Sequence, residues 1–103
     1  MAATRIIAVF NLKPGVAAET YEAWAREVDI PTVKGLTSVS GFQVLRSTGV
    51  LGSDAPPPYA YFEIIDVADM ARFGEEVATP LMQKVAAEFG GMVDVTFVLT
   101  EPL

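Results

Sequence analysis

The charged residues Arg46 and Glu63 are the first candidates for chemistry in this chain. They flank a glycine- and proline-rich loop at residues 49–58, and each lies in an apolar segment with the pattern of a strand. If position 46 pairs with 61 or 63, the two side chains share one face of an antiparallel pair, together with Tyr59 and Tyr61. Such an ion pair among aromatic rings could orient a polar aromatic substrate or shift the pKa of the carboxyl group. The alternative is a cross-strand ion pair with a purely structural role.

Asp29 is a third candidate for catalysis. A desolvated carboxylate at this position could act as a general base; alternatively, it caps backbone amides where the chain turns, or is solvated. Tyr21 and Trp24 could form a stacking wall for a planar ligand, or could simply pack in the core. The sequence therefore gives Arg46, Glu63 and Asp29 as catalytic candidates, and Asn11, Tyr21, Trp24 and Tyr61 as candidates for substrate binding.

The composition excludes several kinds of chemistry. The chain has no cysteine and no histidine, so thiolate catalysis, a serine–histidine triad and haem ligation by histidine are impossible. Its carboxylates show no metal-ligand spacing, and we expect no metal and no other cofactor. The net charge is −6 and the basic residues are scattered, so neither nucleic acid nor an anionic membrane is an expected partner.

The elements that position these residues follow from hydrophobic periodicity. Apolar and β-branched segments predict strands at residues 5–12, 39–48, 59–67 and 92–100. A helix is predicted at residues 18–30, ended or kinked by Pro31. Residues 67–89 predict two helical pieces separated at Thr79-Pro80, with Asp66 as the N-cap and a stop at Gly90-Gly91. This order is the βαββαβ, ferredoxin-like arrangement of an α+β domain that spans residues 1–103.

Both faces of three predicted strands are apolar. The adjacent pairs Ile6/Ile7, Ile64/Ile65 and Val98/Leu99 place apolar side chains on both sides of the sheet. Helices can cover one face only, so we expect a second copy of the chain to cover the other in a homodimer. The first residues show no signal-peptide pattern, and the apolar run at 6–10 is too short to span a membrane, so we expect a cytoplasmic protein.

Several short segments resemble the REDY-like HapK family. They are Phe10-Asn11-Leu12-Lys13-Pro14-Gly15, Tyr21-Glu22-x-Trp24-Ala25-Arg26, Asp29-x-Pro31-x-Val33, Phe42-x-Val44-x-Arg46 and Glu63-Ile64-Ile65-Asp66-Val67. The resemblance implies a dimeric α+β barrel, with a pocket between sheet and helices in each subunit. It also implies a place in secondary metabolism, because named members lie in prodiginine-type pigment pathways. Haem-degrading relatives use an Asn and a Trp but also a His, which this chain lacks.

Three functions remain open from the sequence. The first is a small cofactor-independent enzyme that acts on an aromatic or heterocyclic metabolite. The second is a non-catalytic binding or carrier protein that holds an apolar metabolite in the same cleft. The third is a structural dimer without a ligand, whose cleft would be filled by its own side chains.

Overall fold

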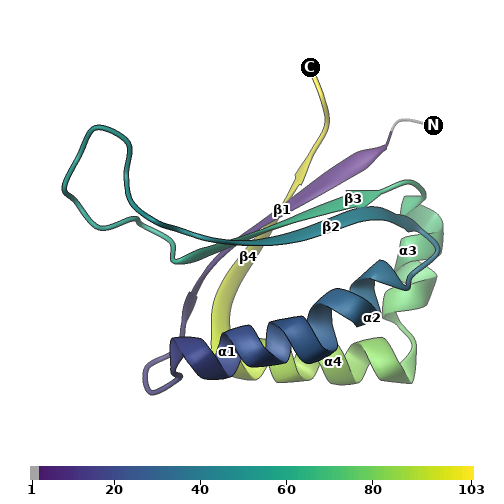
Figure 1. Cartoon of the computed structure of the whole chain (residues 1–103). Coiled ribbons are helices and arrows are strands. Elements are labelled where there is room, and N and C mark those ends of the chain that lie inside the picture. Colours follow the sequence, from purple (N-terminus) through teal and green to yellow (C-terminus); the bar gives the residue numbers. More distant parts are fainter. Residues whose placement is uncertain (1–2) are drawn as a thin grey trace.

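The computed structural model describes residues 3–103, and its centre is a four-stranded antiparallel sheet. The strands are β1 (Thr4–Leu12), β2 (Val39–Arg46), β3 (Tyr61–Val67) and β4 (Val93–Thr100), in the order β2-β3-β1-β4. All helices lie on one face of this sheet (Figure 1). The predicted ferredoxin-like α+β fold is therefore confirmed.

The first helical segment continues through Pro31. Of the two predicted outcomes, an end or a kink at that residue, the end is therefore wrong. It consists of α1 (Ala18–Trp24), the π-helical segment η1 (Ala25–Asp29) and α2 (Ile30–Lys34). Ile30 keeps helical torsions, with φ −59° and ψ −53°, and its N–H donates to the carbonyl of Ala25. A proline in a regular α-helix clashes with the carbonyl four residues earlier. The wider π turn before Pro31 displaces that carbonyl, so the chain passes the proline without leaving the helix.

The π segment also decides which side chains face the sheet. The buried residues of the three segments are Tyr21, Ala25, Asp29 and Val33. In a regular α-helix a spacing of four residues drifts by about 40° at each step, which would turn such a series away from the sheet. The wider turn of η1 corrects the drift, and Asp29 is therefore held against the sheet although it is charged.

The second helical region is divided as predicted, into α3 (Met70–Val77) and α4 (Pro80–Met92). Two details differ from the prediction. The N-cap of α3 is Asp69, whose carboxylate accepts from the N–H of Arg72 at 3.1 Å, because Asp66 is still part of β3. Helix α4 runs through both glycines and ends only where Val93 adopts the extended conformation that begins β4.

The helix-covered face of the sheet carries the core. Phe10 on β1 stacks on Tyr61 of β3, with ring centroids 5.6 Å apart, and meets Phe89 of α4 edge-on at 5.1 Å. Tyr21 closes this aromatic cluster from α1, 4.9 Å from the ring of Tyr61. These contacts fix the helices against one end of the sheet, and a second cluster, which includes Phe42 of β2, packs at the other end.

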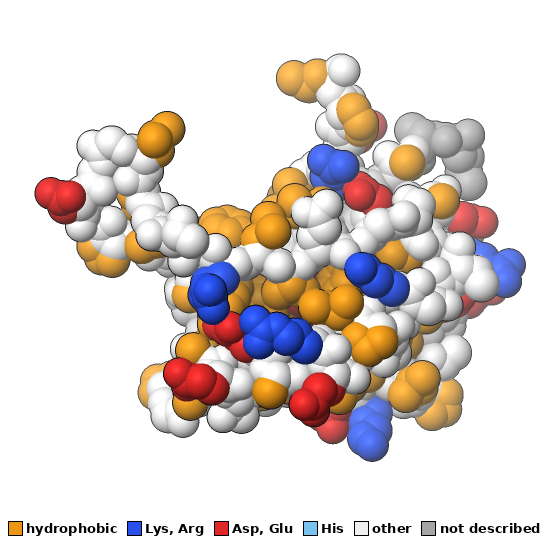
Figure 2. Space-filling model, viewed as in Figure 1, with side chains coloured by type: hydrophobic (Ala, Val, Ile, Leu, Met, Phe, Trp, Pro, Cys, Tyr) orange, Lys and Arg blue, Asp and Glu red, His pale blue; other side chains and the backbone are white. Residues whose placement is uncertain are grey.

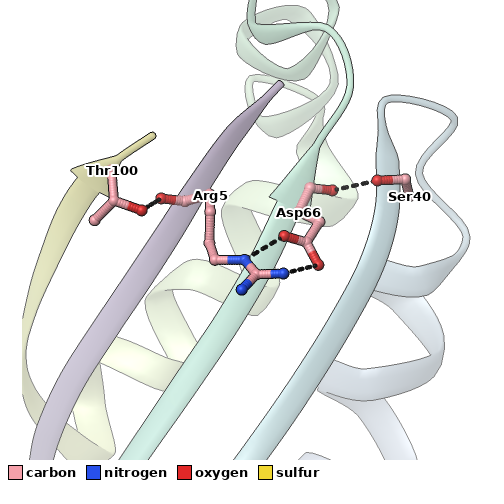
Figure 3. Close-up of polar contacts among 4 residues, drawn as sticks. All are labelled: Arg5, Ser40, Asp66 and Thr100. Carbon is pink, nitrogen blue, oxygen red and sulfur yellow. Dashed lines mark hydrogen bonds and ion pairs between the residues drawn. The ribbon is translucent and has the colours of Figure 1, made fainter. Parts of the chain in front are cut away.

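The opposite face, here called the open face, is apolar at its centre and polar at one end. Its apolar side chains are Ile7, Val9, Leu45, Phe62, Ile64 and Val98. Figure 2 shows hydrophobic side chains above the sheet, on the side away from the helices. At one end Arg5 forms an ion pair with Asp66 at 2.7 Å, and the hydroxyls of Ser40 and Thr100 donate to the backbone of these two residues (Figure 3). These contacts tie all four strands together across that end of the sheet.

The β2–β3 connection, residues 47–60, projects away from the body of the molecule (Figure 1). It is longer than the predicted loop because both flanking strands are about two residues shorter than expected. Asn11 holds its base: its side-chain amide donates to the carbonyl of Pro58 at 3.1 Å and accepts from the N–H of Ala60 at 2.9 Å. In the described residues, none of the helices is long and apolar enough to cross a membrane.

Candidate functional site

A cavity of about 350 Å³ lies between the sheet and the helices. We call it the apolar cavity, because nearly all of its lining is aliphatic or aromatic and comes from both layers. Ile6, Phe42 and Leu99 line it from the sheet, and Val33, Phe73 and Val85 line it from the helices. A volume of this size suits a small organic molecule. The apolar cavity is therefore not filled by the side chains of the protein itself, which argues against a purely structural role.

Asp29 and Glu63 are the two polar side chains in the lining described for this cavity, and we call them the carboxyl pair. Asp29 ends η1 on the side that faces the sheet. Glu63 lies in the middle of β3, between Ala8 on β1 and Val44 on β2, with its side chain on the helix-covered face. The two are 5% and 3% exposed, so both carboxyl groups are removed from water.

Burial sets the protonation of the carboxyl pair. It raises the pKa of Asp29 to about 6, while a hydrogen bond with Glu63 opposes part of that rise. It raises the pKa of Glu63 to about 9, and the charge of Asp29 and the same hydrogen bond add to the rise. Two carboxyl groups in contact in an apolar site cannot both ionise at neutral pH. The pair therefore shares a single proton, and Glu63 Oε2 is buried without a hydrogen-bond partner among residues 3–103.

A second, smaller recess of about 180 Å³ lies on the same face, near the start of the first helix. We call it the polar cleft, and its centre is Glu22. One carboxylate oxygen of Glu22 accepts from Arg46 Nη1 at 2.8 Å and from Arg26 Nη2 at 3.5 Å, and the other accepts from the hydroxyl of Tyr61 at 2.7 Å. These bonds, that of Tyr61 first, hold the pKa of Glu22 below its ordinary value.

Arg46 and Glu63 do not form the ion pair that the sequence suggested. Arg46 pairs with Tyr61 across the strands and Val44 pairs with Glu63, so all these side chains do share one face. However, Arg46 is exposed and forms its ion pair with Glu22 of α1. The buried Glu63 faces Asp29 instead, because η1 brings that residue into contact with the sheet.

Tyr21 belongs to the polar cleft and also interacts with the charge of the carboxyl pair. It is fully buried and lines the polar cleft, and its hydroxyl has no hydrogen-bond partner among residues 3–103. Burial, followed by the negative charges of Glu63 and Asp29, raises the pKa of Tyr21. Tyr61 belongs to the same cleft, and burial and its bond to Glu22 raise its pKa to about 12.

The remaining two predicted residues lie elsewhere. Trp24 is half-buried, stacks on Phe89 with centroids 6.0 Å apart, and donates from Nε1 to Glu88 at 3.1 Å. It lines neither recess. The side-chain amide of Asn11 forms its hydrogen bonds with the base of the β2–β3 connection. Sequence reasoning missed Glu22, although its position four residues before Arg26 was a signal for an ion pair on the helix.

Within the described residues, no group of three or more His, Cys, Asp or Glu side chains is arranged to hold a metal ion. The carboxyl pair by itself offers two carboxylates that share a proton. Its chemistry is therefore that of a general acid and a general base side by side.

Fold and cavity together define a ferredoxin-like α+β protein with an internal cavity between sheet and helices. A family model described as REDY-like protein HapK matches residues 4–103. The crystal structure of HapK from Hahella chejuensis is 31% identical, with a TM-score of 0.79 over 97% of this chain and 92% of that one. The chain belongs to the REDY-like HapK family, as the sequence segments predicted.

More distant structures share the fold alone. A DABB family protein with a ferredoxin-like fold from Mesorhizobium loti is 21% identical, with a TM-score of 0.73 over 100% of this chain and 99% of that one. SnoaB, a cofactor-independent oxygenase from Streptomyces nogalater, is 16% identical, with a TM-score of 0.75 over 100% of this chain and 95% of that one. Comparison with curated protein sequences gives no significant match.

Proposed function

We propose that the chain is a cofactor-independent enzyme that moves protons on an aromatic or heterocyclic small molecule bound in the apolar cavity. The observation that carries this proposal is the carboxyl pair, Asp29 and Glu63, buried in the wall of that cavity with one shared proton. Membership of the HapK family supports an intermediate of secondary metabolism as the substrate.

The pair can perform both halves of a proton transfer. At neutral pH the carboxylate of Asp29 accepts a proton from a C–H, N–H or O–H group of the substrate. The carboxylic acid of Glu63 donates its proton to a second atom, either to complete an isomerisation or to release a hydroxyl group as water. The pair still holds one proton afterwards. That proton returns to Glu63 along the hydrogen bond between the two groups, so no oxidant, reductant or other co-reactant is needed.

The environment supports this role over a structural one. A carboxyl pair in an apolar wall is a poor source of stability, because the desolvation of its charge offsets most of the attraction it provides. Strongly shifted pKa values in a cavity are typical of acid–base sites. The structural relative SnoaB is itself a cofactor-independent oxygenase, which supports the choice of a cofactor-free enzyme on this fold.

The proposal can be tested without knowing the natural substrate. The apolar bicyclic ketones 2-tetralone and 1-indanone have weakly acidic C–H groups, whose exchange for deuterium in D₂O is followed by NMR. We expect the protein to accelerate this exchange. Asp29→Asn and Glu63→Gln should each reduce the acceleration by roughly 10²- to 10⁴-fold, the usual contribution of general acid–base catalysis.

The matched control is Glu75→Gln, the same chemical change on the exposed surface of α3, which should retain the full rate. Binding of the ketones is measured in parallel from the shifts of protein signals. If the ketones bind in the cavity and the exchange rate does not depend on the carboxyl pair, the enzyme proposal fails. The chain is then a carrier, which the apolar lining would also suit.

We further propose that the chain forms a homodimer through the open face. The support is the continuous apolar centre of that face, formed by side chains such as Ile7, Ile64 and Val98 from different strands. Exposing such a surface is costly, at about 25 cal/mol for each Å² of apolar area. The apolar cavity and the polar cleft are on the other face, so this pairing leaves both accessible.

A further inference from the structure

We propose that the apolar cavity selects ligands with an apolar body and one hydrogen-bond donor, above all a cationic one, that binds the carboxyl pair. This inference rests on the proposed function, because it assigns a ligand class to the same cavity. The shape of the ligand follows from the aliphatic and aromatic walls. The donor and its charge follow from the buried carboxyl pair between those walls.

The carboxyl pair has more acceptor oxygens than its one shared proton can satisfy. Both side chains are buried, and an unsatisfied buried acceptor carries the full cost of its lost hydration. Apart from Asp29, the side chains described in the lining are apolar and have no donor to offer. A water molecule would find only these two polar groups in the described wall, the minimum that a buried water needs. A ligand with an N–H or O–H group at this point satisfies the pair as well as water does, and its apolar body also fills the cavity.

The charge of the ligand follows from the charge of the wall. With one proton between them, Asp29 and Glu63 carry one negative charge at neutral pH. No basic side chain is found in the described lining to balance it. In a site of low dielectric constant a cationic group is strongly favoured there, whereas a carboxylate meets charge of its own sign. The cavity should therefore rank ligands of equal shape as cationic, then neutral donor, then apolar, then anionic.

Four probes of one bicyclic shape test this ranking by fluorescence or NMR titration at pH 7.5. They are 4-aminoquinoline, which is protonated, 1-naphthylamine, a neutral donor, 1-methylnaphthalene, which has no donor, and 1-naphthoate, an anion. We expect 4-aminoquinoline to bind roughly ten- to hundredfold more tightly than 1-methylnaphthalene, the range of one charge-assisted hydrogen bond. 1-Naphthylamine should bind with an affinity between these two, and 1-naphthoate should bind most weakly.

Two variants show whether the ranking comes from the carboxyl pair. The double variant Asp29→Asn/Glu63→Gln is neutral and keeps the shape of the wall, so the preference for 4-aminoquinoline over 1-methylnaphthalene should fall below about threefold. Asp29→Asn alone leaves the buried Glu63 protonated and should lose the preference for the cation as well. Glu75→Gln is the matched control and should keep the complete ranking.

The inference is overturned if 1-naphthoate binds as tightly as 4-aminoquinoline, or if the ranking survives in the folded double variant. Its failure can be told apart from failure of the proposed function. A ranking that depends on the pair, in a protein that gives no deuterium exchange, supports the ligand class and refutes the enzyme. Exchange that depends on the pair, without any ranking, supports the enzyme and refutes the ligand class.

Discussion

Glu22 in the polar cleft and Glu63 in the apolar cavity are the same residue type on the same side of one sheet, yet their acidities move in opposite directions. Glu22 accepts three hydrogen bonds, from Tyr61, Arg46 and Arg26, and these favour its ionised form. Glu63 has an apolar wall and a second carboxyl group as neighbours, and both favour its protonated form. Residue type alone therefore gives no information about role: the partners decide whether a carboxylate is a structural anion or a proton donor.

The largest expected difference between the two regions is in the pH dependence of the exchange reaction. Activity requires Asp29 ionised and Glu63 protonated, so the rate should be highest between about pH 6 and about pH 9. Outside that window it should fall by about tenfold for each pH unit, because the active protonation state is lost in that proportion. Arg46→Ala, which changes only the polar cleft, should leave both limits in place. A window that moves with Arg46 would show that the two regions act as one site.

The second prediction uses the open face to separate the site from the dimer. Ile64→Asp places a charge in the middle of the proposed interface and should shift the protein from dimer to monomer in light scattering at micromolar concentration. A weakening of the dimer by roughly 100-fold or more is expected from an unpaired buried charge. The opposite pKa shifts of Glu63 and Glu22 should persist in this variant, since both residues lie on the other side of the sheet. The control is Ala71→Asp on the exposed surface of α3, and an Ile64→Asp protein that remains a dimer would refute the proposed interface.

The third prediction concerns stability. As the pH rises, the contribution of Glu63 to the free energy of unfolding should decrease and that of Glu22 should increase. The pKa of Glu63 is raised in the folded protein, so its contribution is present below the unfolded value of about 4.3 and is lost as the pH rises towards about 9. The pKa of Glu22 is lowered, so its contribution is present above the unfolded value and is lost as the pH falls. The free energy of unfolding should decrease by a few kcal/mol between pH 5 and pH 9.

Urea unfolding across this pH range measures the decrease. Glu63→Gln should flatten the curve above pH 6, since it removes the group with the largest shift. Glu22→Gln should leave that part of the curve unchanged. A wild-type curve that is already flat from pH 5 to pH 9 would show that the carboxyl pair is not desolvated in solution.

The sheet could be predicted from the sequence, because alternation and turn residues determine strand order and register. The sequence left open whether Arg46, Tyr61 and Glu63 share a face, and the pairing of β2 with β3 places them on the same one. The charge partners could not be predicted in the same way. Glu22 reaches Arg46 from a helix, 24 residues away, and no local pattern shows which carboxylate a long arginine side chain will meet.

The position of Asp29 shows a second limit of the sequence. The predicted helix up to Pro31 did not show whether the side chain of Asp29 would face the sheet or the solvent. The π segment that turns it towards the sheet has no simple sequence signature. The sequence therefore identified Asp29 as a candidate and could not identify Glu63 as its neighbour. The family resemblance implied a pocket between sheet and helices, but its volume and lining could not be predicted, since they depend on how side chains from both layers pack.

The smallest predicted effect tests the polar cleft itself. Tyr61→Phe removes the 2.7 Å hydrogen bond that makes the largest contribution to lowering the pKa of Glu22, and keeps the ring that packs on Phe10. The pKa of Glu22, measured by NMR titration of its carboxyl carbon, should therefore rise towards its ordinary value. That of Glu63 should stay where it is, because its shift comes from burial and from Asp29. If both carboxyl groups responded to Tyr61→Phe, the cleft and the cavity would be electrostatically coupled, and Glu22 and Glu63 could not be treated as two independent sites.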